Sequence, residues 1–314
     1  VLFRSILDHF RQEKKNHDLV IAIDRFKALG KTIPPRKTST VGTDVISVED
    51  ATLEDNRHSA PAMIVPKTIT CLCPTFNRLG NPEQQYLLEE AIESFFRQTY
   101  VHKRLLILND NPQQNAIFQH EQVKVVNTGR RFLSLGDKHN ALFTMADSEH
   151  MCMWDDDDIS LPHRLEFLME RLGDSEYYNP RRQWFLQGRE NPQLSHDHSH
   201  GVCFNSSIVT LSGLRKINMA PPTAASDMKM DHALMAHPRV SVATTLQPLK
   251  PSEWSYIYRW GVSNNHVSGQ PKIDENYDRN GNVFVPIGDF TLNPHWRIDY
   301  THMISKYLSE RNLP

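Results

Sequence analysis

The sequence lacks the features that mark membrane proteins and basic nucleic-acid-binding proteins. None of its apolar runs approaches the length of a bilayer span and no signal peptide is visible, so we expect no membrane span. The formal net charge is −2 over 314 residues, which excludes an overall basic field but leaves a local basic groove open. The hydrophobic share of 39% and the charged share of 23% are those of a soluble globular protein.

Cysteine is scarce as well. The chain has 4 cysteines, and three of them (Cys71, Cys73 and Cys152) lie in apolar, strand-like runs where cysteine behaves as a small hydrophobic residue. Cys71 and Cys73 alternate on one predicted strand and are too close in sequence for a zinc pair of the usual spacing. We therefore expect a reducing, cytoplasmic compartment.

The first part of the chain has little regular pattern. Residues 6–30 carry apolar residues at helical spacing, and residues 31–66 contain several prolines and a Thr/Ser run, which is typical of a linker or an irregular wrap. The five residues Val1–Ser5 match the translation of a common sequencing-adapter tail, so we expect them to be an artefact and assign them no function. Residues 1–66 are predicted to form an N-terminal extension.

From residue 67 onward, apolar strands alternate with amphipathic helices. This alternation predicts βαβ units and therefore an α/β fold, with a Rossmann-like, mixed but mainly parallel sheet flanked by helices. Ser160 is expected to cap the helix that follows it. The predicted strands are 68–73, 105–108, 123–126 and 151–154, and other predicted helices are 81–96, 137–146, 226–235 and 298–308.

The most informative stretch is the run of four aspartates Asp155–Asp158, which follows the apolar run His150–Trp154. Like charges in a cluster repel and raise one another's pKa, so a cation or hydrogen-bond donors must compensate them. Carboxylate oxygens are ligands that Mg²⁺ and Mn²⁺ prefer, together with a substrate's phosphates. At the carboxyl end of a buried strand, the cluster predicts a site for a metal–diphosphate substrate, and a solvated acidic turn is the alternative.

Several motifs, taken in order, resemble those of the family 2 glycosyltransferases of the GT-A fold. The resemblance covers residues 67–268, with a nucleotide-sugar half (67–160) and an acceptor half (161–268). Residues 269–314 are expected to be a C-terminal extension with a hairpin and a helix. The motifs are Pro74–Arg78, Asn109-Asp110, Gly136–Ala141, Asp155–Asp158, Ser226–Leu234, Tyr258–Trp260 and Asn264–His266.

The resemblance implies inverting transfer from a nucleoside-diphosphate sugar, most readily a UDP-sugar. In that family the Pro-Thr-Phe-Asn-Arg turn borders the base and ribose, and the acid after the next strand accepts a hydrogen bond from the nucleobase. Asp110 has a plain alternative, which is to cap the turn before Asn111-Pro112. The donor-binding candidates are Pro74, Thr75, Arg78, Asp110, Lys138 and Asn140.

The acid cluster matches the family's Asp-x-Asp signature, with Asp155 and Asp157 in the two named positions. The resemblance implies that Asp157 ligates Mn²⁺ or Mg²⁺ and that Asp155 contacts the ribose or a metal-bound water. The extra acids leave the register open by one, so Asp156 is also a donor-binding candidate and Asp158 is suited to cap the next helix. His266 is the candidate for a further metal or phosphate ligand.

Asp231 is the candidate general base, because inverting transfer needs a carboxylate within reach of the attacking hydroxyl. The sequence departs from the family pattern here. Met230 stands where a Glu is usual, and Asp227 is a nearby competitor. A surface acid on a helix is the alternative for Asp231.

The acceptor is open between a saccharide and, as a less expected case, a hydroxymethylated base in phage DNA. The pairs Lys103-Arg104, Arg130-Arg131 and Arg181-Arg182 are candidate phosphate contacts in the second case. Two further alternatives concern the reaction itself. A nucleotidyltransferase usually has a Gly-rich loop after its first strand, whereas residues 76–81 contain one glycine. A non-catalytic GT-A-like binding domain stays open because the Glu-Asp pair is substituted.

Overall fold

The computed structural model describes residues 67–188, 193–197, 204–223, 225–244, 248–260 and 287–314. The helix predicted over residues 6–30, the hairpin and His266 lie outside these ranges. The boundaries predicted at residues 66 and 268 also adjoin or fall within undescribed stretches, so they stay predictions.

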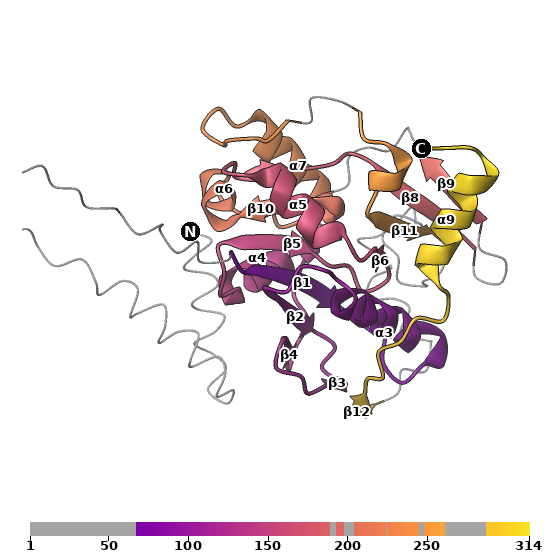
Figure 1. Cartoon of the computed structure of the whole chain (residues 1–314). Coiled ribbons are helices and arrows are strands. Elements are labelled where there is room, and N and C mark those ends of the chain that lie inside the picture. Colours follow the sequence, from indigo (N-terminus) through magenta and orange to yellow (C-terminus); the bar gives the residue numbers. More distant parts are fainter. Residues whose placement is uncertain (1–66, 189–192, 198–203, 224, 245–247, 261–286) are drawn as a thin grey trace, which may run out of the picture. The chain divides into compact units, whose positions relative to one another are not determined.

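The centre of the described chain is a six-stranded sheet with the order β4-β2-β1-β5-β10-β7 (Figure 1). The first four strands are parallel, and β10 joins β5 in the antiparallel direction. This confirms the prediction of a mixed, mainly parallel α/β sheet. The strands are β1 (Ile69–Thr75), β2 (Lys103–Asn109), β4 (Val123–Asn127), β5 (His150–Met153), β7 (Tyr177–Tyr178) and β10 (Ile208–Thr210).

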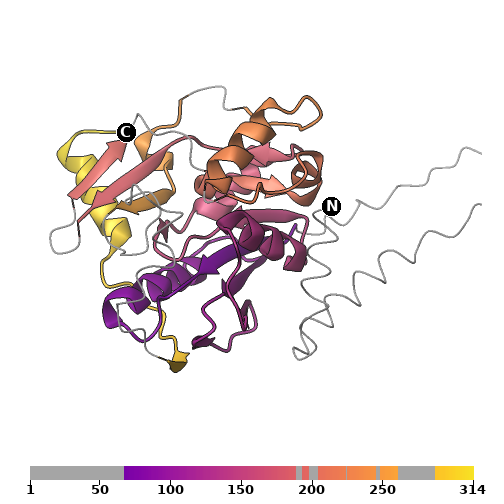
Figure 2. The same cartoon turned by 180° about the vertical axis from the view of Figure 1, so that it is seen from behind.

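Helices cover both faces of this sheet, as the front and back views show (Figures 1 and 2). On one face, α3 (Pro82–Phe96) and α5 (Arg164–Leu172) pack against the Cys71 and Cys73 side of β1. On the other face, Leu72 meets residues of α4 (Leu135–Met145), α6 (Leu211–Lys216) and α7 (Ser226–Ala236). The alternation of side chains along a strand explains how neighbouring residues serve two separate cores.

A smaller sheet of the order β6-β11-β8-β9 lies beside the end of β5. Its core includes Ile159, Trp184 and Ile257, together with Tyr300 and Ile304 of the C-terminal helix α9 (Tyr300–Glu310). The strands are β6 (Ile159–Ser160), β8 (Gln183–Gln187), β9 (Gln193–Asp197) and β11 (Tyr256–Trp260). A separate parallel pair joins β3 (Gln114–Ile117) to β12 (Gly288–Thr291), and the short 3₁₀ helices are η1 (Phe204–Ser206) and η2 (Pro251–Glu253).

Most of the predicted elements are confirmed, with shifts of a few residues at their ends. The expected cap at Ser160 is wrong: this residue pairs with Tyr256 in the small sheet, and the helix begins at Arg164. The Ser160 hydroxyl instead lies 2.6 Å from Nη1 of Arg164. Ser160 lies in strand β6, three residues before the N-cap position His163, so it cannot take the cap position.

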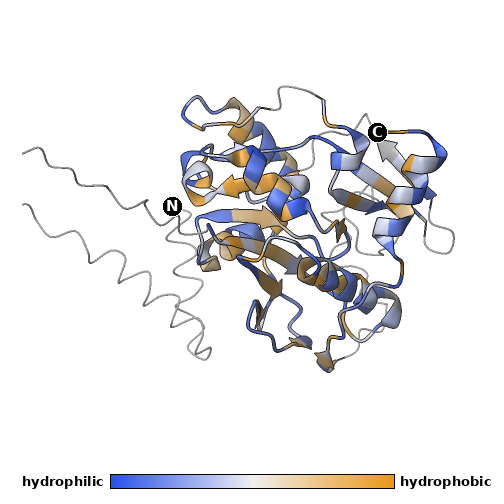
Figure 3. Ribbon diagram, in the orientation of Figure 1, coloured by the Kyte–Doolittle hydropathy of each residue, from blue (hydrophilic) through white to orange (hydrophobic). Residues whose placement is uncertain are grey.

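The hydropathy pattern agrees with this layering, because the central strands are coloured mostly as hydrophobic in Figure 3. Cys71, Cys73 and Cys152 are buried free thiols in those strands, as the apolar runs indicated. Within the described residues, none of the helices combines the length and apolar character that a bilayer span requires.

Candidate active site at the carboxyl edge of the sheet

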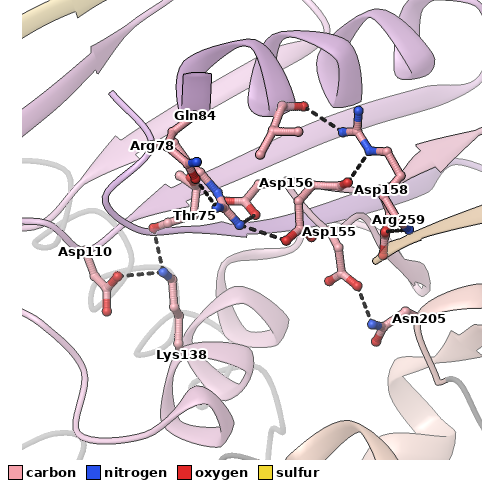
Figure 4. Close-up of polar contacts among 12 residues, drawn as sticks. Thr75, Arg78, Gln84, Asp110, Lys138, Asp155, Asp156, Asp158, Asn205 and Arg259 are labelled. Carbon is pink, nitrogen blue, oxygen red and sulfur yellow. Dashed lines mark hydrogen bonds and ion pairs between the residues drawn. The ribbon is translucent and has the colours of Figure 1, made fainter. Parts of the chain in front are cut away.

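Polar residues gather where the parallel strands β1, β2 and β5 end. Thr75 lies opposite Asn109 in the β1–β2 register, and β5 runs parallel to β1 on its other side. Carboxyl ends of neighbouring parallel strands meet at one edge of a sheet, and that edge is where open α/β sheets bind ligands. Figure 4 shows Thr75, Asp110 and Lys138 together with the acid cluster at this edge.

A buried lysine joins the ends of β1 and β2. Lys138 of α4 donates to the Thr75 carbonyl at 2.6 Å and to Asp110 Oδ1 at 2.6 Å (Figure 4). The other Asp110 oxygen accepts from the Phe132 amide at 3.1 Å. Burial lowers the pKa of Lys138, and the charge of Asp110 opposes that shift. The structure therefore brings three donor-binding candidates into one contact set.

The end of β1 also carries an unsatisfied polar atom. Thr75 is 2% exposed, and its hydroxyl has no hydrogen-bond partner among the described residues. A buried hydroxyl without a partner is costly, so such an atom points to a missing ligand or water. Pro74, just before it, is half-buried.

Arg78 contacts the acid cluster directly. Its guanidinium donates to both oxygens of Asp156, at 3.0 and 2.8 Å, and to Asp157 Oδ2 at 2.9 Å. The Nη1 atom of Arg78 donates to Gln84 Oε1 at 3.0 Å (Figure 4). Arg78 is thus a buried counterion of two aspartates, and the nucleotide contact implied by the family resemblance stays a prediction.

The last aspartate of the cluster is held by strand β11. The Arg259 amide donates to Asp158 Oδ1 at 2.7 Å, and the Tyr256 hydroxyl lies 2.5 Å from Asp158 Oδ2. The Arg259 side chain hydrogen-bonds to the Asp157 carbonyl and to Glu90 of α3. Asp158 therefore anchors the small sheet to the cluster and does not cap a helix.

Asp155 is the least compensated member of the cluster. Its Oδ2 accepts from the Asn205 side chain and lies 3.2 Å from the Tyr256 hydroxyl, whereas no hydrogen bond reaches Oδ1 among the described residues. Burial, followed by the negative charges of neighbouring aspartates, raises the pKa of Asp155 well above its usual range. These neighbours are Asp158, Asp157, Asp227 and Asp156.

A divalent cation fits this arrangement in part. The open oxygen and the excess negative charge at Asp155 suit a cation that takes one or two carboxylates and completes its shell with phosphates. Within the described residues, no group of three or more His, Cys, Asp or Glu side chains forms a metal site by itself. The diphosphate of a substrate would therefore have to supply part of the coordination.

The candidate base Asp231 lies on α7 and is 1% exposed. Its Oδ1 accepts from the Tyr177 hydroxyl at 2.5 Å and from Asn179 Nδ2 at 2.7 Å, and its Oδ2 accepts from Arg181 at 3.3 Å. The predicted alternative of a surface acid is wrong, because the residue is buried. Its carboxylate is engaged on both oxygens by protein donors.

Asp227 lies one turn earlier, in the first turn of α7, and is half-buried. Burial raises its pKa, backbone amides at the helix start oppose the shift, and the charge of Asp231 adds to it. Asp227 also acts electrostatically on Asp155. Asp231 is therefore held by neighbouring side chains, whereas Asp227 is half-buried at the start of the same helix.

Asn140 is not among these contacts, because its side-chain amide pairs with the backbone of Ala220. His266 lies outside the described residues, so its predicted role stays a prediction. Sequence reasoning missed the partners of the cluster on other elements, namely Gln84, Asn205, Tyr256 and Arg259. The motif around Arg259 was visible, but its buried contacts depend on the pairing of β11 with β6.

Comparisons with known proteins agree with this α/β domain. The family model described as "Glycosyl transferase family 2" matches residues 70–230, about half of the chain. The chain belongs to glycosyl transferase family 2. This confirms the family inferred from the motifs, and the mainly parallel sheet flanked by helices agrees with the predicted GT-A class.

Solved structures with a similar arrangement include those of TarS 1-349 from S. aureus. The crystal structure of TarS 1-349 has 15% identity and a TM-score of 0.43, and its complex with UDP has 16% and 0.43. The complex of TarS 1-349 with UDP-GlcNAc has 15% identity and a TM-score of 0.42. Each match covers 61% of this chain, which spans 60%, 60% and 58% of those chains respectively. Curated protein sequences contain no significant match.

Proposed function

We propose that this protein is an inverting glycosyltransferase that moves a sugar from a nucleoside-diphosphate sugar to an acceptor hydroxyl. The observation that carries the proposal is the gathering of the Asp110–Lys138 contact and the acid cluster after β5 at the carboxyl edge of the sheet in a family 2 domain. A second set of acids, Asp227 and Asp231, lies on α7, and the charge of Asp227 raises the pKa of Asp155. One set suits the donor's leaving group, and the other suits the acceptor's proton.

The donor side is supported by the contact set at the ends of β1 and β2. The unsatisfied Thr75 hydroxyl offers a hydrogen bond to the nucleoside, and Asp110 retains lone pairs that a base N–H can use. Uracil carries such an N–H between two carbonyls, so a UDP-sugar is the donor that we propose. Lys138 holds Asp110 and the Thr75 carbonyl in place for it.

Metal dependence is part of the proposal. Asp155, with its open oxygen, and Asp157 would hold Mn²⁺ or Mg²⁺ beside the diphosphate. Bound there, the cation would neutralise the charge that develops on the departing nucleoside diphosphate. Arg78 keeps Asp156 and Asp157 fixed and compensates part of their charge in the absence of substrate.

The base is a carboxylate of α7. As the acceptor oxygen attacks the anomeric carbon, its proton passes to the carboxylate, and the bond from the sugar to the diphosphate breaks with inversion. We assign this role to Asp227, because Asp231 uses both oxygens in buried hydrogen bonds. The sequence-based candidate Asp231 is the competing assignment.

Measurement of the released product tests the proposal. We would offer UDP- and GDP-sugars with glycan and hydroxymethylated-DNA acceptors, in the presence of Mn²⁺, Mg²⁺ or EDTA. We expect nucleoside diphosphate from a UDP-sugar, lost with EDTA and reduced at least about a hundredfold in Asp155→Asn. The surface variant Asp174→Asn, whose side chain is fully exposed, serves as the matched control.

Other outcomes identify the alternatives. Release of pyrophosphate would indicate a nucleotidyltransferase. Absence of nucleotide binding by calorimetry with and without Mn²⁺ would indicate a non-catalytic domain. Glycosylation of DNA with a steep salt dependence would identify modified DNA as the acceptor, whereas a response confined to glycans would identify a saccharide.

A further inference from the structure

One turn of α4 lies between the donor side of the site and the start of α7. Lys138 in this turn reaches the Thr75 carbonyl and Asp110, both at 2.6 Å. The neighbouring residues of the same turn contact the backbone that leads into α7. The turn therefore touches both sides of the proposed reaction centre.

Asn140 makes the most specific of these contacts. Its Nδ2 donates to the Ala220 carbonyl at 3.0 Å, and its Oδ1 accepts from the Ala220 amide at 2.8 Å. The side chain is 2% exposed. Both functional ends of the amide are used by one backbone residue, and this geometry leaves neither end directed at a nucleotide.

Gly136 brings the same backbone still closer. An added Cβ at this position would lie 1.8 Å from the Pro221 carbonyl oxygen, a distance that no side chain tolerates. The Gly136 amide also donates to the Thr223 carbonyl at 3.2 Å. Only glycine permits this approach, so the first position of the Gly-x-x-x-Asn stretch is explained by packing against residues 221–223.

His139 completes the contact at the residue before Asp227. Its Nδ1 lies 3.0 Å from the Ser226 hydroxyl, and both residues are almost fully buried. Burial, helped by the charge of Lys138, lowers the pKa of His139 to about 3. The ring therefore stays neutral at physiological pH.

We propose that Asn140, together with Gly136 and His139, is a positioning element that holds the start of α7 and thereby sets Asp227 against the bound donor. This inference rests on the proposed function, and it replaces the donor-binding role that the family resemblance implied for Asn140. One helical turn then positions Asp110 and Thr75 through Lys138, and it positions Asp227 through its contacts with the start of α7. Positional errors of about 1 Å at such a base can cost on the order of a hundredfold in rate.

The variant Asn140→Ala tests the inference. We expect kcat for transfer to fall at least about tenfold while the dissociation constant of UDP, measured by calorimetry with Mn²⁺, stays within about twofold. Lys138→Met is the matched variant from the same turn, and it should weaken UDP binding because it releases Asp110. Weaker UDP binding by Asn140→Ala with an unchanged kcat at saturation would overturn the inference and restore a donor contact.

A double-mutant cycle separates positioning from general damage. If Asn140 acts through Asp227, then Asn140→Ala should have little further effect on kcat in an Asp227→Asn background. Fully additive losses would contradict the inference. Ser226→Ala removes only the hydroxyl that lies 3.0 Å from His139 Nδ1, and it provides a milder change to the same contact in case Asn140→Ala folds poorly.

Hydrogen exchange provides a readout that does not depend on activity. Amides of residues 227–231 should exchange faster in Asn140→Ala, whereas those of β2 should not change. If the exchange result is as expected but no donor is turned over, the proposed function fails and the positioning contact stands. If transfer occurs but exchange at α7 is unchanged, the inference fails by itself.

Discussion

The acids after β5 and the acids of α7 are compensated in different ways. After β5, Asp156 and Asp157 share the Arg78 guanidinium, and Asp158 takes an amide and a hydroxyl from β11. On α7, Asp231 is saturated by three neighbouring side chains, whereas Asp227 is half-buried near the helix start.

These contacts separate the carboxylates that stabilise the fold from those that are available for chemistry. An acid whose oxygens are all engaged by buried donors stabilises the fold, and releasing it for proton transfer would leave those donors unpaired. Asp155 has an oxygen that no hydrogen bond reaches among the described residues, and Asp227 is half-buried in the first turn of α7. We therefore propose Asp155 and Asp227 as the reactive acids, one in each region.

The largest expected effect comes from removing the counterion on the β5 side. Arg78→Ala leaves two buried aspartates without their cation, so the free energy of unfolding should fall by about 3–5 kcal/mol. Urea unfolding measures this, with Lys306→Ala as the control because its ion pair is exposed. Adding Asp156→Asn to Arg78→Ala should recover part of the loss. A loss of less than about 1 kcal/mol would show that Arg78 does not compensate the cluster.

The next largest effect separates the two acids of α7. Asp227→Asn should lower kcat at least about a hundredfold, equivalent to about 2.7 kcal/mol, with little change in stability. Asp231→Asn should instead lower the free energy of unfolding by about 1–3 kcal/mol, because its donors lose acceptors, and it should affect kcat less. Turnover assays and urea unfolding of both variants test this assignment. A larger loss of kcat in Asp231→Asn than in Asp227→Asn would make Asp231 the base.

The smallest expected effect comes from removing the Thr75 hydroxyl. Unlike the acids above, this buried group has no hydrogen-bond partner among the described residues. Thr75→Val removes a buried oxygen that has no partner among the described residues, so it should leave stability unchanged or slightly higher. UDP should bind about fivefold more weakly, since a net hydrogen bond contributes about 1 kcal/mol. Calorimetry checks this, with the exposed Thr301→Val as the control. Unchanged affinity would remove Thr75 from the donor site.

Much of the fold could be predicted because its signals are local. The apolar runs identified the main strands, and the spacing of apolar residues identified α3, α5 and α9. The expectation for Ser160 failed because its pairing partner, Tyr256, is distant in sequence. Similarly, the donor role implied for Asn140 took no account of Ala220, whose backbone lies 80 positions away.

The sequence alone determined the order of the strands, the helices and the acidic strand ends, because side-chain periodicity and the cost of crowded charges act between near neighbours. Which acid is neutralised and which is left open was decided only by the tertiary structure. Arg78 and Asp156 are 78 positions apart, and His139 and Ser226 are 87 apart. Hydrogen bonds act over a few ångströms in space, so packing of the helices and sheets must first bring such partners together.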